Sequence, residues 1–248
     1  MSNCYPQVSP PGLGKAHTAD WFAVGVRQDL DPTGNKAWQS MTYIGIGHKS
    51  NPDNYNPFSK SAILVLNQEF YNQFHNDWQY SLAVSYRRQD EYAESPPFEH
   101  DTPRIKQEFR LYGRLTYTLI KTSRIKLAST FRQEFRKFHI PNAINESEDF
   151  QLRSRFRLQL TASLNSKNTH RLITSAEQLF SISKENTYNT WTDFNYRESR
   201  FLLYYSYAPE TLPYIFNVGY MNNLVGNKKP YDVHYLAVDI IIKNPFAS

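Results

Sequence analysis

Three arginines at alternate positions, Arg153, Arg155 and Arg157, are the densest group of side chains able to bind a charged partner. A guanidinium group keeps its charge and offers five donors in a planar fork, so it pairs with carboxylates or attracts other anions. Alternate residues lie on one face of a β-strand. The spacing therefore predicts a strand with a cationic face, suited to ion pairing or to anion binding.

The other face of this strand is apolar, with Phe156, Leu158 and Leu160 between and after the arginines. The alternation runs from residue 148 to residue 165, whereas globular strands usually have about 3–10 residues. Two barrel types fit such a strand. A soluble lipocalin-like barrel places the apolar face inward, and a membrane barrel places the arginines inward.

The same alternation recurs between proline clusters, as expected because proline does not occur inside laddered strands. It predicts eleven strands, near residues 20–30, 38–48, 61–75, 77–90, 104–121, 124–139, 149–164, 170–184, 191–208, 214–224 and 231–246. Short connections such as HND (75–77) alternate with long ones such as DEYAESPPFEHDTP (90–103). This alternation is typical of outer-membrane barrels, with short periplasmic turns and long extracellular loops.

The fold class that follows is all-β: a single antiparallel, up-and-down transmembrane β-barrel of about twelve strands. Bacterial single-chain barrels have an even number of strands, so eleven recognisable strands indicate twelve, with ten as the alternative. Residues 1–19 are expected to be an N-terminal tail, a plug or a tether, and residues 20–248 the barrel. The mean hydropathy of −0.64 and the lack of a run of about 18 apolar residues exclude a transmembrane helix.

Arginine and glutamate recur together on the polar faces of the strands. Arginine forms bidentate pairs in confined spaces, which favours an inward-facing network. Pairs such as Glu108 with Arg132, and Glu134 with Arg153, are expected across neighbouring strands, each offsetting the desolvation of the other. The expected lumen-lining residues are Glu69, Arg87, Glu108, Arg110, Arg114, Arg132, Glu134, Arg136, Arg153, Arg155, Arg157, Arg171, Glu177, Glu198 and Arg200.

Four segments share a pattern of Glu-x-Arg and Arg-x-Arg strands: QEFRLYGRLTYTL (107–119), FRQEFRKF (131–138), LRSRFRLQL (152–160) and YRESRFLLYYSY (196–207). SAEQLF (175–180) adds an acidic strand that contains Glu177. FNVGYMNN (216–223) adds a late Gly-Tyr strand. Together they resemble a family of Gram-negative outer-membrane β-barrels catalogued as a domain of unknown function. The resemblance covers residues 60–246 and implies the fold and location without an activity. The sequence departs from this family in lacking a signal peptide and in continuing past Phe246.

The segment MSNCYPQVSPPGLGK contains Cys4, the single cysteine, which excludes an internal disulfide and a zinc-finger-like cysteine cluster. This start has no apolar core typical of a signal peptide. We therefore expect either a cytosolic chain or one that begins after a removed signal peptide. Cys4 is expected to be a free thiol on the tail, with lipid attachment as the alternative.

The expected function is that of a non-enzymatic outer-membrane barrel with a structural or accessory role, without cofactor or metal. A passage for anions or acidic solutes, lined by Arg153, Arg155 and Arg157, is the alternative. A barrel-wall hydrolase is a further alternative, although no serine signature accompanies the seven histidines, of which His234 alone lies inside a predicted strand. Interleaved glutamates and a net charge of +5 argue against nucleic acid. The expected partners are outer-membrane lipid and, through the tail or long loops, another envelope protein.

Overall fold

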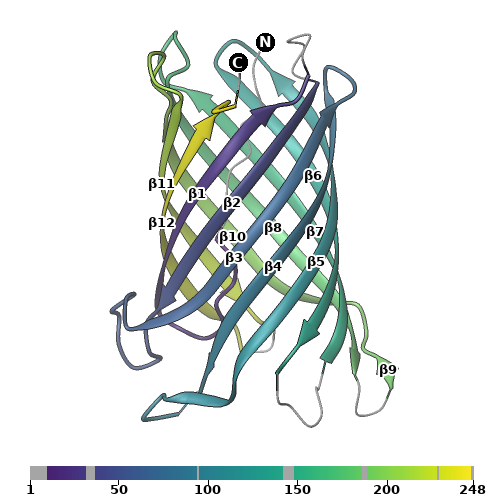
Figure 1. Ribbon diagram of the computed structural model, residues 1–248, viewed down its shortest axis with the longest axis vertical. Helices are drawn as coiled ribbons and strands as arrows, with labels where there is room; N and C mark the ends of the chain where they lie inside the picture. Colours follow the sequence, from purple (N-terminus) through teal and green to yellow (C-terminus); the bar gives the residue numbers. More distant parts are fainter. Residues whose placement is uncertain are drawn as a thin grey trace.

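The structure is a computed structural model that describes residues 10–31, 37–93, 95–141, 148–185, 189–227 and 229–246. Its strands form one closed barrel, drawn upright in Figure 1. Among these residues, no helix is long and apolar enough to span a membrane.

Twelve strands are present in the described part of the chain, so the all-β class and the strand number of about twelve are confirmed. They are β1 (Thr18–Asp29), β2 (Trp38–Lys49), β3 (Lys60–Gln73), β4 (Trp78–Tyr92), β5 (His100–Lys121), β6 (Ile125–His139), β7 (Glu148–Ser163), β8 (His170–Glu185), β9 (Thr190–Trp191), β10 (Asn195–Tyr207), β11 (Tyr214–Val225) and β12 (Tyr231–Lys243).

The wall itself consists of eleven strands, because β9 pairs only with the end of β8 and β10 continues the barrel beside β8. Consecutive wall strands are antiparallel, as an up-and-down barrel requires. An odd number leaves the first and last strands running in the same direction. The barrel therefore closes through a parallel pair, β1 with β12, in register from Thr18 opposite His234 to Arg27 opposite Lys243. The even-number argument thus does not hold for the wall.

The two ends of the barrel differ in their connections. The β3–β4 and β5–β6 turns, residues 74–77 and 122–124, lie at the upper end in Figure 1. The β2–β3 loop, residues 50–59, and the β4–β5 connection lie at the lower end, beside the start of β1. These elements show the predicted alternation of short turns and longer loops.

Burial alternates along the strands and identifies the inner face. On β5, Phe109 and Leu111 are 54% and 53% exposed, whereas Glu108 and Arg110 are 6% and 8% exposed. The other wall strands follow the same rule, with apolar side chains exposed between buried residues. The arginines and glutamates of these strands therefore point into the lumen and most large apolar side chains point outward, which excludes the apolar-inward arrangement of a lipocalin-like barrel.

Part of the lumen is filled by aromatic side chains that pack onto glycines. The Trp21 ring on β1 covers Gly45 on β2 so closely that a Cβ at Gly45 would lie 2.3 Å from it. Likewise, a Cβ at Gly219 on β11 would lie 2.4 Å from the Tyr204 ring on β10. These contacts fill a barrel that is too wide for ordinary apolar side chains to close.

The segment before β1 lies inside the barrel and joins β1 at the lower end in Figure 1. Leu13 is 1% exposed, and its backbone N–H donates to the Tyr235 hydroxyl at 3.0 Å. Arg200 donates to the Pro10 carbonyl at 3.2 Å. The part of the expected tail from Pro10 to Leu13 thus belongs to the filled interior, Thr18 and Ala19 belong to β1, and Cys4 lies outside the described residues.

Candidate functional site in the barrel interior

Strands β3 to β8 and β10 carry the charged half of the lumen. Alternation places every second side chain of each strand inside, and the cross-strand register brings these side chains to similar heights. On β5 and β6, for example, Arg110 lies opposite Arg136 and Arg114 lies opposite Arg132. Like charges placed opposite one another destabilise a sheet, so carboxylates must lie between them.

Glu108 on β5 is the first such carboxylate. Arg136 on β6 binds it with two nitrogens, each at 2.7 Å. Arg110 on the same strand donates at 2.5 and 2.7 Å, and Arg87 on β4 lies 3.4 Å away. One buried carboxylate therefore joins three arginines from three strands. Arg136 also donates to Gln151, which extends the network to β7.

Glu134 on β6 is the second carboxylate, and its side chain is fully buried. Arg132 lies 2.7 Å from it, Arg155 on β7 lies 2.9 Å from it, and Arg110 lies 3.4 Å from its other oxygen. Arg110 thus links Glu108 to Glu134. These contacts join the neighbouring strands β5, β6 and β7 on the inner face of the wall.

Glu177 on β8 continues the network on the next strand. Arg155 donates to it at 2.6 Å through the nitrogen that does not bind Glu134, and Arg157 lies 3.1 Å away. Arg155 therefore bridges two glutamates on strands to either side of its own. This arrangement uses the planar fork of the guanidinium group, which a lysine does not provide.

Glu198 on β10 and Glu69 on β3 hold the remaining ion pairs of the network. Glu198 receives hydrogen bonds from Arg200 at 2.6 Å and from Asn223 at 2.9 Å, and Arg153 lies 3.8 Å away. Glu69 lies 3.2 Å from Arg114. Its oxygens also accept hydrogen bonds from two hydroxyl groups, those of Tyr112 at 2.8 Å and Ser81 at 2.5 Å.

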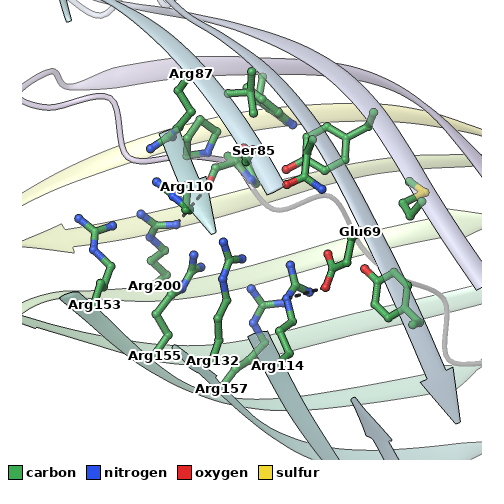
Figure 2. A pocket seen from close by; sticks show the side chains of 18 residues that line it. Glu69, Ser85, Arg87, Arg110, Arg114, Arg132, Arg153, Arg155, Arg157 and Arg200 are labelled. Atoms are coloured by element: carbon green, nitrogen blue, oxygen red, sulfur yellow. Dashed lines mark hydrogen bonds and ion pairs between the residues drawn. The ribbon is translucent and has the colours of Figure 1, made fainter. Parts of the chain in front are cut away.

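A cavity of about 40 Å³ lies among these arginines. Figure 2 shows the guanidinium groups of Arg132, Arg153, Arg155 and Arg157 directed into it from one side. Eight arginines line it, together with Glu69, whereas the other four glutamates of the network do not. These four glutamates thus bind the arginines on the side away from the cavity, and the cavity wall is largely cationic.

The structure places the sequence-predicted lumen residues inside the barrel, and all except Arg171 belong to the ion-pair network. Arg171 lies near the upper end and donates to the Asn168 carbonyl at 3.0 Å. The expected Glu108–Arg132 pair is wrong, because the register sets Arg132 opposite Arg114. Glu134 and Arg153 are opposite one another as expected, but the ion pairs of Glu134 are with the three arginines described above.

Several interior residues were missed by the sequence analysis. Tyr112 lies between Arg110 and Arg114 on the inner face of β5, and its ring centroid is 3.5 Å from the Arg132 guanidinium carbon. Its position between two inward-facing arginines in the alternation could have predicted that it points into the lumen. Pro10 and Pro11 line the cavity, and nothing in their sequence indicated this, because an irregular segment has no periodicity.

The charged side chains of this interior can act through electrostatic attraction and hydrogen bonding. Nine arginines and five glutamates form the network described above, an excess of four positive charges. Among the described residues, no group of three or more His, Cys, Asp or Glu side chains is placed to hold a metal ion. The arrangement can brace the wall, and it can attract an anion.

No protein-family model matches the sequence, and the search of curated proteins gives no match.

Proposed function

We propose that this chain is an integral outer-membrane β-barrel with a closed, Arg/Glu-braced lumen and a structural or accessory, non-enzymatic role. The observation that carries the proposal is the orientation of the two faces. Buried charges lie inside, and large apolar side chains such as Leu82, Val84 and Phe156, each more than half exposed, lie outside. Exposing this apolar surface to water is unfavourable, whereas contact with the hydrocarbon core of a bilayer is not.

The height of the apolar face fits a bilayer. On β5 the outward residues are apolar or glycine from Phe109 to Leu119, while Gln107 precedes this run and the exposed Lys121 follows it. A tilted transmembrane strand needs about 9–11 residues to cross the hydrocarbon core. The run on β5 has this length and is flanked by polar groups.

Aromatic rings gather toward both ends of the outer face. At the short-turn end, the rings of Trp78 and Tyr117 are 4.6 Å apart. At the other end, the rings of Phe180 and Phe194 are 5.6 Å apart, and Trp191 on β9 contacts Phe150. Aromatic girdles at the two interfaces are typical of membrane barrels, so this distribution supports the same proposal.

Refolding with and without lipid tests the membrane assignment. Urea-unfolded protein is diluted either into phospholipid vesicles or into buffer alone, and β-structure is measured by circular dichroism. The vesicles are then washed with sodium carbonate and floated on a density gradient. We expect β-structure and flotation only with lipid. A folded, monodisperse protein in buffer without lipid or detergent would overturn the proposal.

An anion passage is the second candidate function, and the excess of arginines over glutamates is the observation that favours it. A fixed positive field lowers the barrier for anions in a pore. The small cavity volume and the inserted segment from Pro10 to Leu13 favour the closed barrel instead. The conductance measurement described in the Discussion separates these two functions.

A further inference from the structure

The arginine-lined cavity has a property that bracing of the wall does not explain. Four of the five carboxylates of the network do not line the cavity, whereas eight of its arginines do, so the groups facing the cavity are mostly cationic. We propose that the cavity binds a small oxyanion, of the phosphate, sulfate or carboxylate class, as an internal counter-ion. This site goes beyond the structural role proposed above and does not depend on the location of the protein.

The charge of the network supports an added anion. Nine arginines share five glutamates, and burying a charge without a partner is costly. Glu69 is the one acid of the network that lines the cavity, and Arg114, Tyr112 and Ser81 already bind it. An oxyanion in the cavity would supply part of the missing negative charge.

Arg153 is the residue that points most clearly to a ligand. Its side chain is 14% exposed, and the nearest carboxylate oxygen, on Glu198, is 3.8 Å away and thus beyond hydrogen-bond distance. Its Nε is buried, and no described residue accepts a hydrogen bond from it. Glu198 is already bound by Arg200 and Asn223. Arg153 therefore directs a fork of donors into the cavity, with no close acceptor in the part of the chain that the structure describes (Figure 2).

The shape of the cavity suits an oxyanion better than chloride. One water needs about 10–15 Å³ of cavity volume. The cavity of about 40 Å³ therefore holds roughly three waters or one small oxyanion. The surrounding guanidinium groups come from several strands, and each can give two parallel hydrogen bonds to an oxyanion. Chloride is spherical and gains nothing from this forked geometry.

Thermal unfolding in a non-ionic detergent without phosphate groups tests the site. Sodium phosphate, sulfate or acetate is added either to the folded protein or during refolding, and sodium chloride at equal ionic strength is the reference. We expect a saturable rise in Tm with phosphate or sulfate that chloride does not give. A phospholipid added to the micelles is expected to give none. Water alone in the cavity predicts no difference between the salts, and this result would overturn the proposal, as would a rise with the phospholipid alone.

Two arginine variants tie the effect to the cavity. Arg153→Gln should abolish the saturable rise, because it removes the guanidinium group that lacks a close acceptor. Arg197→Gln is the matched control: Arg197 donates to Ser181 at 2.7 Å and does not line the cavity. Arg197→Gln should keep the rise. Equal responses of both variants and the parent would contradict the assignment.

A conservative change covers the case in which Arg153→Gln does not fold. Arg153→Lys keeps the charge and loses the fork, so the concentration of phosphate at half-saturation should rise about tenfold, the loss expected for one charge-assisted hydrogen bond. An unchanged half-saturation point in Arg153→Lys would exclude Arg153 as a ligand.

Because these measurements are made in detergent, their failure leaves the membrane assignment standing, and a failure of lipid insertion leaves the anion site standing.

Discussion

Arg136 binds Glu108 through two parallel contacts, with Nε 2.7 Å from Oε1 and Nη2 2.7 Å from Oε2. The two residues lie on neighbouring strands, and each side chain is only 8% exposed. Arg–Glu contacts recur from β4 to β10 and join strands of the wall on its inner face. Their importance lies in the cost of losing one partner, because the other charge then stays buried without compensation.

Arg136→Gln is therefore expected to lower the free energy of unfolding by about 3–5 kcal/mol. The change removes two contacts to Glu108 and the hydrogen bond to Gln151. Urea unfolding in lipid vesicles, followed by tryptophan fluorescence, measures the loss. The control is Lys167→Gln, which removes an exposed ion pair with Glu210 and should cost about 0–1 kcal/mol. Similar losses in the two variants would mean that the interior is wet rather than closed.

Leu158→Arg tests the outer face. Leu158 is 48% exposed and lies midway along the outward apolar run of β7. An arginine at the bilayer midplane should cost about 2–4 kcal/mol and reduce insertion, whereas an exposed site in water tolerates the change within about 0.5 kcal/mol. Flotation with vesicles measures insertion, and Leu158→Phe is the apolar control. Normal insertion of Leu158→Arg would count against a lipid-facing wall.

A glycine substitution tests the aromatic packing inside the lumen, and a second one on the outer face is its control. Gly219→Ala would place a Cβ 2.4 Å from the Tyr204 ring, so either the ring or the strand must shift. Overpacking of this kind costs about 1–3 kcal/mol. At Gly113 the nearest side-chain atom, on Leu82, would be 3.5 Å from the new Cβ, an ordinary contact. Urea unfolding should therefore show a loss for Gly219→Ala and little change for Gly113→Ala, and the opposite order would refute this account of the interior.

The alternation of residues from Arg153 to Leu158 was enough to predict the strand and its two faces, because the period of a strand is visible in sequence. It was not enough to predict which residues form ion pairs, because the partners depend on the register of neighbouring strands. The register sets Arg132 opposite Arg114 rather than opposite Glu108, and short turns alone do not determine it. Long side chains also reach diagonally, as Arg155 does toward Glu134.

The alternation predicted eleven strands, which is the number in the wall, but the even-number argument that raised the count to twelve does not hold for the wall. The predicted strand at 191–208 divides into β9 and β10, with residues 192–194 between them. The position of Leu13 inside the lumen depends on contacts with residues distant in sequence, such as Tyr235. Contacts of this kind have no local signature in the sequence.

The ionic selectivity of a triple variant separates bracing from passage. Replacing Arg153, Arg155 and Arg157 with Gln removes three positive charges. It leaves Glu134 without Arg155 and Glu177 without both Arg155 and Arg157. In a closed barrel the main effect should be a sharp fall in Tm, since each broken buried pair costs about 3–5 kcal/mol. In an open pore Tm should change little, and the reversal potential in a salt gradient should move toward cation preference.

Electrical conductance of the unmodified protein tests the central claim most directly. Vesicles in which flotation has established insertion are fused with a planar bilayer, and current is recorded across a range of voltages. A lumen filled by the Arg/Glu network, the aromatic rings and the segment from Pro10 to Leu13 predicts no steady conductance. A stable, anion-selective conductance of the parent protein would contradict the closed barrel and establish a passage in its place.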